Sequence, residues 1–167
     1  MKKIALAVAA LAIFGSASVS AQTCTANAAF PSVPDAGGPV VVNGDSCTGA
    51  TNQLNASCSD ANPIGAANDY VYSFNLGTGA SGNASLAPTG WDAYLAIMAA
   101  SCASTATCPT ESENGGNGVT EQVNFTGIAA GSYFLLVSSF AAAGNCGPFA
   151  LTITPTLPVS LQKFSVE

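Results

Sequence analysis

Tyr70-Val-Tyr-Ser-Phe-Asn-Leu76 carries the pattern that points most clearly to the fold class. Aromatic or aliphatic residues occupy every second position, so one face of the extended chain carries Tyr70, Tyr72, Phe74 and Leu76. A two-residue period over this length predicts a β-strand that lays one face against a core. A glycine-rich cluster at residues 77–82 follows at once and marks a turn.

Similar short runs on both sides of this stretch predict further strands. Residues 132–138 are apolar on both faces, which is typical of a central strand. Residues 119–126 place Val119, Val123 and Phe125 together on one face. The other predicted strands are residues 39–43, 83–87, 93–99 and 149–153. No sustained helical period follows the first 21 residues, so we predict an all-β fold, a jelly-roll-like antiparallel β-sandwich of about 7–9 strands.

Residues 1–21 are predicted to be a signal peptide. Two lysines open the chain, Ile4–Phe14 is apolar, and a small-residue segment ends at Ala21, the expected cleavage point. A helix over Ile4–Phe14 rises only about 16 Å, too little to cross a hydrocarbon core of ~30 Å. We therefore expect a bacterial protein that is secreted or held at the cell surface, with no membrane insertion of the mature chain.

Two further regions follow the signal peptide. Residues 22–154 are expected to form one disulfide-stapled β-sandwich. Residues 155–167 form a proline-containing C-terminal tail, because Pro155 and Pro158 fix φ and block a helix. Within this tail, residues 159–166 are a candidate for one more strand.

The charge balance excludes whole classes of partner. The chain has three Lys and Arg residues together, nine Asp and Glu residues, and no His. After Ala21 the only cationic side chain is Lys163; one lysine against nine acids gives a net charge of −8. Binding a phosphate backbone requires Lys or Arg, so nucleic acid and anionic membranes are excluded as partners. Such a surface attracts cations instead.

All six cysteines follow the signal peptide, and an even number in an exported chain predicts disulfides. Sequence alone does not select the pairing. The favoured pair is Cys102 with Cys108, which bracket a short polar loop; Cys47 with Cys58 is the next choice and leaves Cys24 with Cys146. A zinc site is disfavoured because no two cysteines have the CxxC spacing.

Residues suited to catalysis are scarce, and we predict that the protein is not an enzyme, with no catalytic residue assigned. The chain has no His to act as a base at neutral pH. Two carboxylates about 5–10 Å apart are able to hydrolyse a glycosidic bond. Asp69 and Asp92, each beside an aromatic residue, are the candidates for that alternative.

Asp69 and Asp92 are also the candidate metal ligands. Calcium prefers several hard oxygen ligands in a loop that is free to bend, and the acids and amides of residues 111–117 extend the set. No EF-hand spacing is present, so the cofactor is either Ca²⁺ or none. Trp91, the only tryptophan, is a candidate ligand-binding residue that stacks on a sugar or peptide, or else a plug for one end of the sandwich.

Four motifs follow one another from residue 66 to residue 154. They are Asn68-Asp-Tyr-Val-Tyr-Ser-Phe74, Gly90-Trp-Asp-Ala-Tyr-Leu95, Ile128-Ala-Ala-Gly-Ser-Tyr-Phe-Leu-Leu-Val137 and Gly147-Pro-Phe-Ala-Leu-Thr-Ile153. In this order they resemble the bacterial pre-peptidase C-terminal domain family. The resemblance implies a non-catalytic jelly-roll sandwich of the kind attached to secreted proteases, of which some relatives bind calcium or collagen. No protease domain precedes the motifs and the cysteines lie outside the family pattern, so we do not expect a protease-accessory role.

These observations predict a secreted, non-catalytic binding module, calcium-stabilised, with an extracellular glycan or protein as its ligand. The alternative is a structural subunit of an extracellular fibre or matrix. In that case the tail strand of one copy adds to the sheet edge of another copy.

Overall fold

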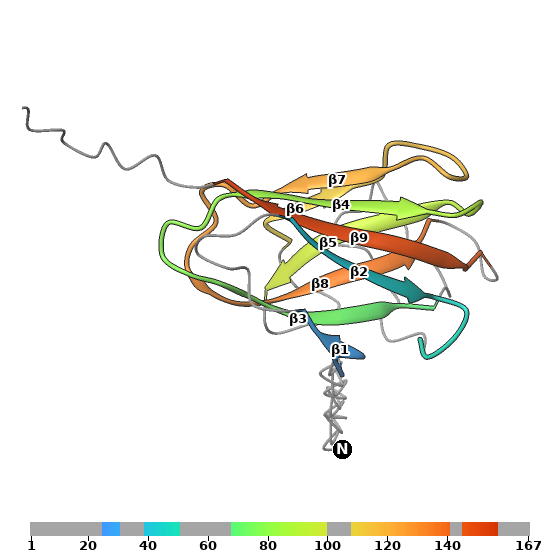
Figure 1. The fold of residues 1–167 in the computed structure, drawn as a ribbon, viewed down its shortest axis with the longest axis horizontal. Coiled ribbons are helices and arrows are strands. Elements are labelled where there is room, and N and C mark those ends of the chain that lie inside the picture. The colour runs from blue at the N-terminus through green and yellow to red at the C-terminus, as the bar shows by residue number, and fades with distance from the viewer. Residues whose placement is uncertain (1–24, 31–38, 51–67, 100–107, 141–144, 157–167) are drawn as a thin grey trace, which may run out of the picture.

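The computed structural model describes residues 25–30, 39–50, 68–99, 108–140 and 145–156, and these residues form two β-sheets. The first sheet has the strand order β1-β3-β8-β5-β6, and the second has the order β2-β9-β4-β7 (Figure 1). The strands are β1 (Ala28–Ala29), β2 (Val40–Asp45), β3 (Tyr70–Leu76), β4 (Gly82–Pro88), β5 (Ala93–Ala99), β6 (Thr110–Ser112), β7 (Glu121–Asn124), β8 (Gly131–Ser139) and β9 (Pro148–Pro155). The all-β sandwich expected from the sequence is confirmed.

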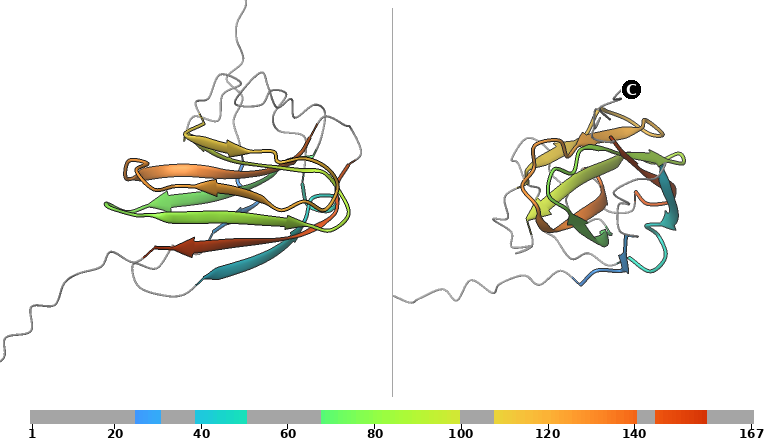
Figure 2. Two further views of the ribbon diagram at one scale, coloured as in Figure 1. Left: turned by 90° about the horizontal axis from the view of Figure 1, so that it is seen from above. Right: turned by 60° about the vertical axis from the view of Figure 1, so that its left-hand side comes forward.

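The strands pair antiparallel, with the exception of β1, which lies parallel to β3 over two residue pairs. In the first sheet β8 is central, with β3 on one side and β5 on the other. In the second sheet β9 lies between β2 and β4. Figure 2 shows the two sheets as two layers stacked face to face. No helix in this part of the chain is long and apolar enough to cross a membrane.

The main core lies between the two sheets. Tyr72, Phe74 and Leu76 of β3 pack there against inward residues of the second sheet, as their two-residue period predicts. The Phe74 and Phe125 rings meet edge to face with centroids 5.9 Å apart. Burial of aromatic side chains of this size is the main stabilising contribution that a sandwich of two sheets offers.

A second apolar cluster lies on the outer face of the first sheet. Its members are buried and come from its three adjacent strands β3, β5 and β8: Val71, Tyr94, Ala96, Met98 and Leu136. A strand that is buried on both faces needs apolar residues at successive positions. The continuous apolar run at residues 132–138 is explained in this way, and the prediction of a central strand there is confirmed.

The structure differs from the sequence-based prediction at two short strands and one boundary. The strands β1 and β6 were not predicted, because two or three residues are too few to show a period. Val119 does not belong to a strand and is 39% exposed, so its assignment to a buried face is wrong. Residues 1–21, the candidate strand 159–166 and the rest of the tail beyond Thr156 lie outside the residues that the structure describes.

Candidate functional site

Asp69 is a buried side chain at the start of β3. It is 0% exposed, and the Ser138 hydroxyl on the neighbouring strand β8 donates a hydrogen bond of 2.7 Å to its Oδ1. A carboxylate in this position ties two strands together. This carboxylate therefore serves the pairing of β3 with β8.

Asp92 lies on the other side of β8, in the turn before β5. Its backbone carbonyl accepts a hydrogen bond of 3.2 Å from the Phe140 amide. Because β8 separates β3 from β5, the backbones of Asp69 and Asp92 are at least about 10 Å apart. The structure therefore does not join the two predicted ligands in one solvent-facing site. The side-chain Oδ1 of Asp92 is buried and has no hydrogen-bond partner.

Glu121 is a buried carboxylate that sequence reasoning did not single out. It opens β7, is 0% exposed, and its Oε2 accepts hydrogen bonds from the Ser112 hydroxyl (2.7 Å) and the Asn114 amide (2.8 Å). The Ser112 hydroxyl oxygen in turn accepts from the Asn114 side chain (2.8 Å). This network fastens β6, at the edge of one sheet, to β7, at the edge of the other. Oε1 of Glu121 is buried without a partner.

The loop of residues 113–120 connects β6 to β7 and carries Glu113. Gly115, Gly116 and Gly118 have positive φ, which lets the loop turn back on the sandwich. The Gly118 amide donates a hydrogen bond of 2.9 Å to the Trp91 carbonyl, so the loop is attached to the residue that precedes Asp92. We call Asp92, Glu113 and Glu121 the acidic cluster.

The electrostatics of Glu113 reflect its neighbours in the acidic cluster. Desolvation raises the pKa of its carboxyl group, the negative charges of Asp92 and then Glu121 raise it further, and a hydrogen bond from the Gly115 amide opposes them. A raised pKa means that the folded state binds this proton more tightly than the unfolded state. Ionised Glu113 therefore lowers stability at neutral pH, and this penalty disappears as the pH falls through the raised pKa.

The first testable prediction concerns this carboxyl group. An NMR titration of the Glu113 side chain is expected to give a pKa above the usual glutamate value, and Asp92→Asn should lower it because one negative charge is removed. Glu111→Gln is the matched control, since it removes a charge from β6 that is not among the causes of the raised pKa. Equal shifts in the two variants would contradict the described cluster.

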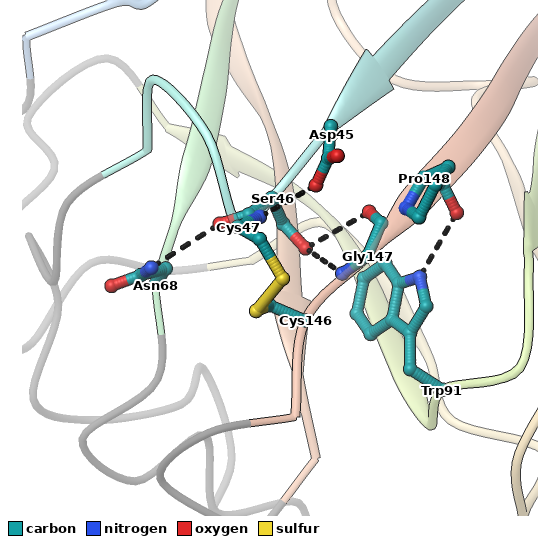
Figure 3. The surroundings of a disulfide bond; sticks show 8 residues. All are labelled: Asp45, Ser46, Cys47, Asn68, Trp91, Cys146, Gly147 and Pro148. Carbon is teal, nitrogen blue, oxygen red and sulfur yellow. Dashed lines mark hydrogen bonds between the residues drawn. A yellow bond between two sulfur atoms is a disulfide. The ribbon is translucent and has the colours of Figure 1, made fainter.

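A disulfide joins the two strands at one edge of the second sheet (Figure 3). Cys47 follows β2, Cys146 precedes β9, and their Cα atoms are 5.0 Å apart. Beside the bond, the Ser46 hydroxyl accepts a hydrogen bond of 3.0 Å from the Gly147 amide and approaches the Gly147 carbonyl at 3.3 Å. The pairing of Asp45 with Pro148 brings the two cysteines together.

The observed bond corrects two of the predicted pairs. Cys47 is bonded to Cys146, so neither the predicted pair Cys47–Cys58 nor the predicted pair Cys24–Cys146 forms. The short loop between Cys47 and Cys58 favoured that pair, whereas the register of β2 on β9 brings Cys47 to Cys146. Cys108 is also disulfide-bonded, and its partner lies outside the described residues, as do Cys24, Cys58 and Cys102. The pairing of Cys102 with Cys108 stays a prediction.

Trp91 closes the end of the sandwich next to this disulfide. Its side chain is 3% exposed, and its indole Nε1 donates a hydrogen bond of 3.0 Å to the Pro148 carbonyl (Figure 3). The backbone of Gly147 packs so closely on the ring that an added Cβ would lie 2.8 Å from it. The plug is therefore the correct alternative, and the exposed stacking platform is wrong.

Comparisons with known proteins give structural likenesses only. No family model matches the chain, and no curated protein matches it. Among solved structures, it is similar to the pre-peptidase C-terminal domain of a collagenase from Bacillus anthracis, at 14% identity and a TM-score of 0.49, over 78% of this chain and 98% of that one. It is also similar to a periplasmic inhibitor of g-type lysozyme from Aeromonas hydrophila, at 15% identity and a TM-score of 0.47, over 77% and 96% of the two chains. The collagenase domain belongs to the family that the four sequence motifs resemble.

Proposed function

We propose that this chain is an exported, non-catalytic module that binds an extracellular protein or glycan, with Ca²⁺ as its structural ion. The observation that carries the proposal is the exposed loop of residues 114–120, which two anchored contacts hold on a rigid sandwich. Its backbone is fixed by the bond from the Asn114 amide to Glu121 and by the bond from the Gly118 amide to the Trp91 carbonyl.

A loop that is fixed before binding loses less conformational entropy when a partner docks. Binding residues are commonly found on loops that a rigid scaffold positions. This loop exposes the amide of Asn117 and the hydroxyl of Thr120, both of which suit hydrogen bonds to a glycan or to a polar protein surface.

The burial of Asp69 supports a non-catalytic role. A glycosidase needs both carboxylates on one substrate cleft, with a separation of about 5–10 Å. Asp69 is 0% exposed and hydrogen-bonded to Ser138, so it serves the sheet. The disulfide between Cys47 and Cys146 supports export, because such bonds persist in oxidising compartments.

The direct test is a binding panel of glycans and immobilised extracellular matrix proteins, run with the mature chain in Ca²⁺ and again in EGTA. We expect one ligand class to bind, and the double variant Asn117→Ala/Thr120→Ala to weaken that binding about tenfold without changing the melting temperature. Thr78→Ala, in the exposed turn between β3 and β4, is the control and should bind normally. A folded protein that binds nothing in either condition would refute the binding module.

A second candidate function, self-association into a fibre, is favoured by the β2 edge. Among the described strands β2 lies at the end of its sheet and pairs only with β9. Val41 on this strand is 56% exposed, and β2 contains no lysine or proline, the residues that disfavour pairing of an edge strand with another chain. The proposed occupant is residues 159–166 of a second copy, which carry the only lysine after the signal peptide.

For this candidate we expect Val41→Lys to abolish assembly of the concentrated protein, as measured by light scattering and electron microscopy. A lysine on an edge strand disfavours strand addition without disturbing the core. Val119→Lys is the matched control, because Val119 is exposed but lies outside the strands. A wild-type protein that stays monomeric at high concentration would remove this candidate.

A further inference from the structure

The acidic cluster has no cationic side chain to balance it within the described residues. The chain has no His or Arg, and its lysines, Lys2, Lys3 and Lys163, all lie outside the described residues. The described acids are Asp45, Asp69, Asp92, Glu111, Glu113 and Glu121. A buried carboxylate without a charge partner carries a large desolvation cost, so a cation from solvent is the natural complement.

Glu121 provides the strongest sign of such a cation. Its side chain is 0% exposed, yet only Oε2 accepts hydrogen bonds, and Oε1 has no partner. An ionised carboxylate has about four acceptor positions, and a buried one normally uses them. Oε1 belongs to the same carboxylate whose Oε2 accepts the hydrogen bond from the Asn114 amide, and Asn114 is the residue that follows Glu113.

Asp92, in the turn before β5, also has a buried carboxylate oxygen without a hydrogen-bond partner, Oδ1. The bond from the Gly118 amide to the Trp91 carbonyl holds the loop of Glu113 against this turn. Two buried carboxylate oxygens from separate elements therefore border one loop, and that loop carries a third carboxylate.

We propose that Glu121 and Asp92 bind a hard divalent cation of the Ca²⁺ class, and that Glu113 completes the site from the loop. This inference rests on the structural ion of the proposed function and names the residues that hold it. No three acidic or cysteine side chains in the described ranges are already arranged to hold a metal ion, so the three carboxylates would have to draw together on binding. Ca²⁺ suits such a site because it accepts six to eight oxygen ligands, including water, in flexible geometry.

The assignment differs from the one expected from the sequence. Asp92 is kept, Glu121 and Glu113 are added, and Asp69 is left out because β8 lies between it and Asp92. Glu111 is also excluded, because its Oε2 accepts a hydrogen bond from the Tyr94 hydroxyl, and Tyr94 belongs to the outer cluster.

The test is a thermal melt of the mature, calcium-stripped chain with and without millimolar Ca²⁺. Ligand at about 100 times its Kd should raise the wild-type midpoint by several degrees. Glu121→Gln and Asp92→Asn should each lose most of that shift, whereas Glu111→Gln, which removes an equal charge from β6, should keep it. The comparison within each variant, with Ca²⁺ against without, is insensitive to any change in basal stability.

Terbium(III), a luminescent substitute for Ca²⁺, provides a second readout if a variant folds poorly. A Tb³⁺ ion beside Asp92 lies close to the only tryptophan, so excitation of Trp91 should sensitise its emission, and added Ca²⁺ should quench that emission. If Ca²⁺ stabilised all variants equally, or if Tb³⁺ emission were not sensitised, the ion would bind elsewhere, and the assignment to Asp92, Glu113 and Glu121 would be wrong. If the wild type showed neither a calcium shift nor Tb³⁺ emission, the chain would have no calcium site. Binding of a glycan or matrix protein in the panel would still support the proposed binding module.

Discussion

Simultaneous replacement of Cys47 and Cys146 by alanine is expected to lower the free energy of unfolding by about 2–5 kcal/mol. The bond joins residues 99 positions apart, and closing so long a loop removes much of the entropy of the unfolded chain. Urea unfolding of the wild type and the variant under non-reducing conditions measures the difference.

Ser46→Ala is the control for this experiment. It removes the side-chain hydrogen bonds to Gly147 at the same junction but leaves the backbone bond and the disulfide in place, and it should cost only about 1–2 kcal/mol. A disulfide variant no less stable than Ser46→Ala would show that local packing, rather than the cross-link, stabilises this edge of the sheet.

The second large effect is expected from Trp91. Truncation to alanine should destabilise the fold by about 3–5 kcal/mol, because it empties a buried site and removes the indole hydrogen bond to the Pro148 carbonyl, which then keeps only the bond from the Thr89 amide. Trp91→Phe keeps most of the volume and should cost less, mainly the lost hydrogen bond. Chemical unfolding measures both, and the tryptophan emission of the folded wild type should resist quenching by iodide.

Val119→Ala is the matched control for these substitutions. Val119 is 39% exposed in the loop of residues 113–120, so its truncation should change stability by less than about 0.5 kcal/mol. If Trp91→Ala were equally mild and iodide quenched the native emission, the indole would be on the surface, and the stacking platform would have to be reinstated.

The strands could be predicted from the sequence wherever burial imposes a regular pattern. β3 places Tyr72, Phe74 and Leu76 in the main core and buries only Val71 on its other face, so it shows a two-residue period, whereas β8 is central and shows a continuous apolar run. β6 could not be predicted in this way: it is short and polar, and it is held by its pairing with β5. Pairing between distant segments leaves no local pattern in the sequence.

The same reason accounts for the errors at the candidate site and the disulfide. Cys47 and Cys146 meet through the register of β2 on β9, which no loop length reveals. Glu121 could have been identified from the sequence, because it shares a strand face with the buried Val123. An acid at an inward position needs a hydrogen-bond or charge partner. Asp69 and Asp92 look equivalent in the sequence, but β8 separates them in the fold.

The acidic cluster connects the fold to the proposed function. Glu121 holds the first residues of the exposed loop, and Asp92 follows the residue to which the loop is fastened. A cation that bridges these carboxylates would rigidify the loop and prepare it for a partner. Calcium binding and partner binding should therefore be coupled, with tighter binding of the partner in Ca²⁺ than in EGTA.

Equilibrium dialysis of the mature, folded chain against Ca²⁺ counts the bound ions and is the sharpest test of a calcium site at the acidic cluster. We predict about one Ca²⁺ bound through the acidic cluster in the wild type, lost in the double variant Asp92→Asn/Glu121→Gln and retained in Glu111→Gln. A folded wild type that binds no Ca²⁺, or a double variant that binds as much as the wild type, would contradict the site.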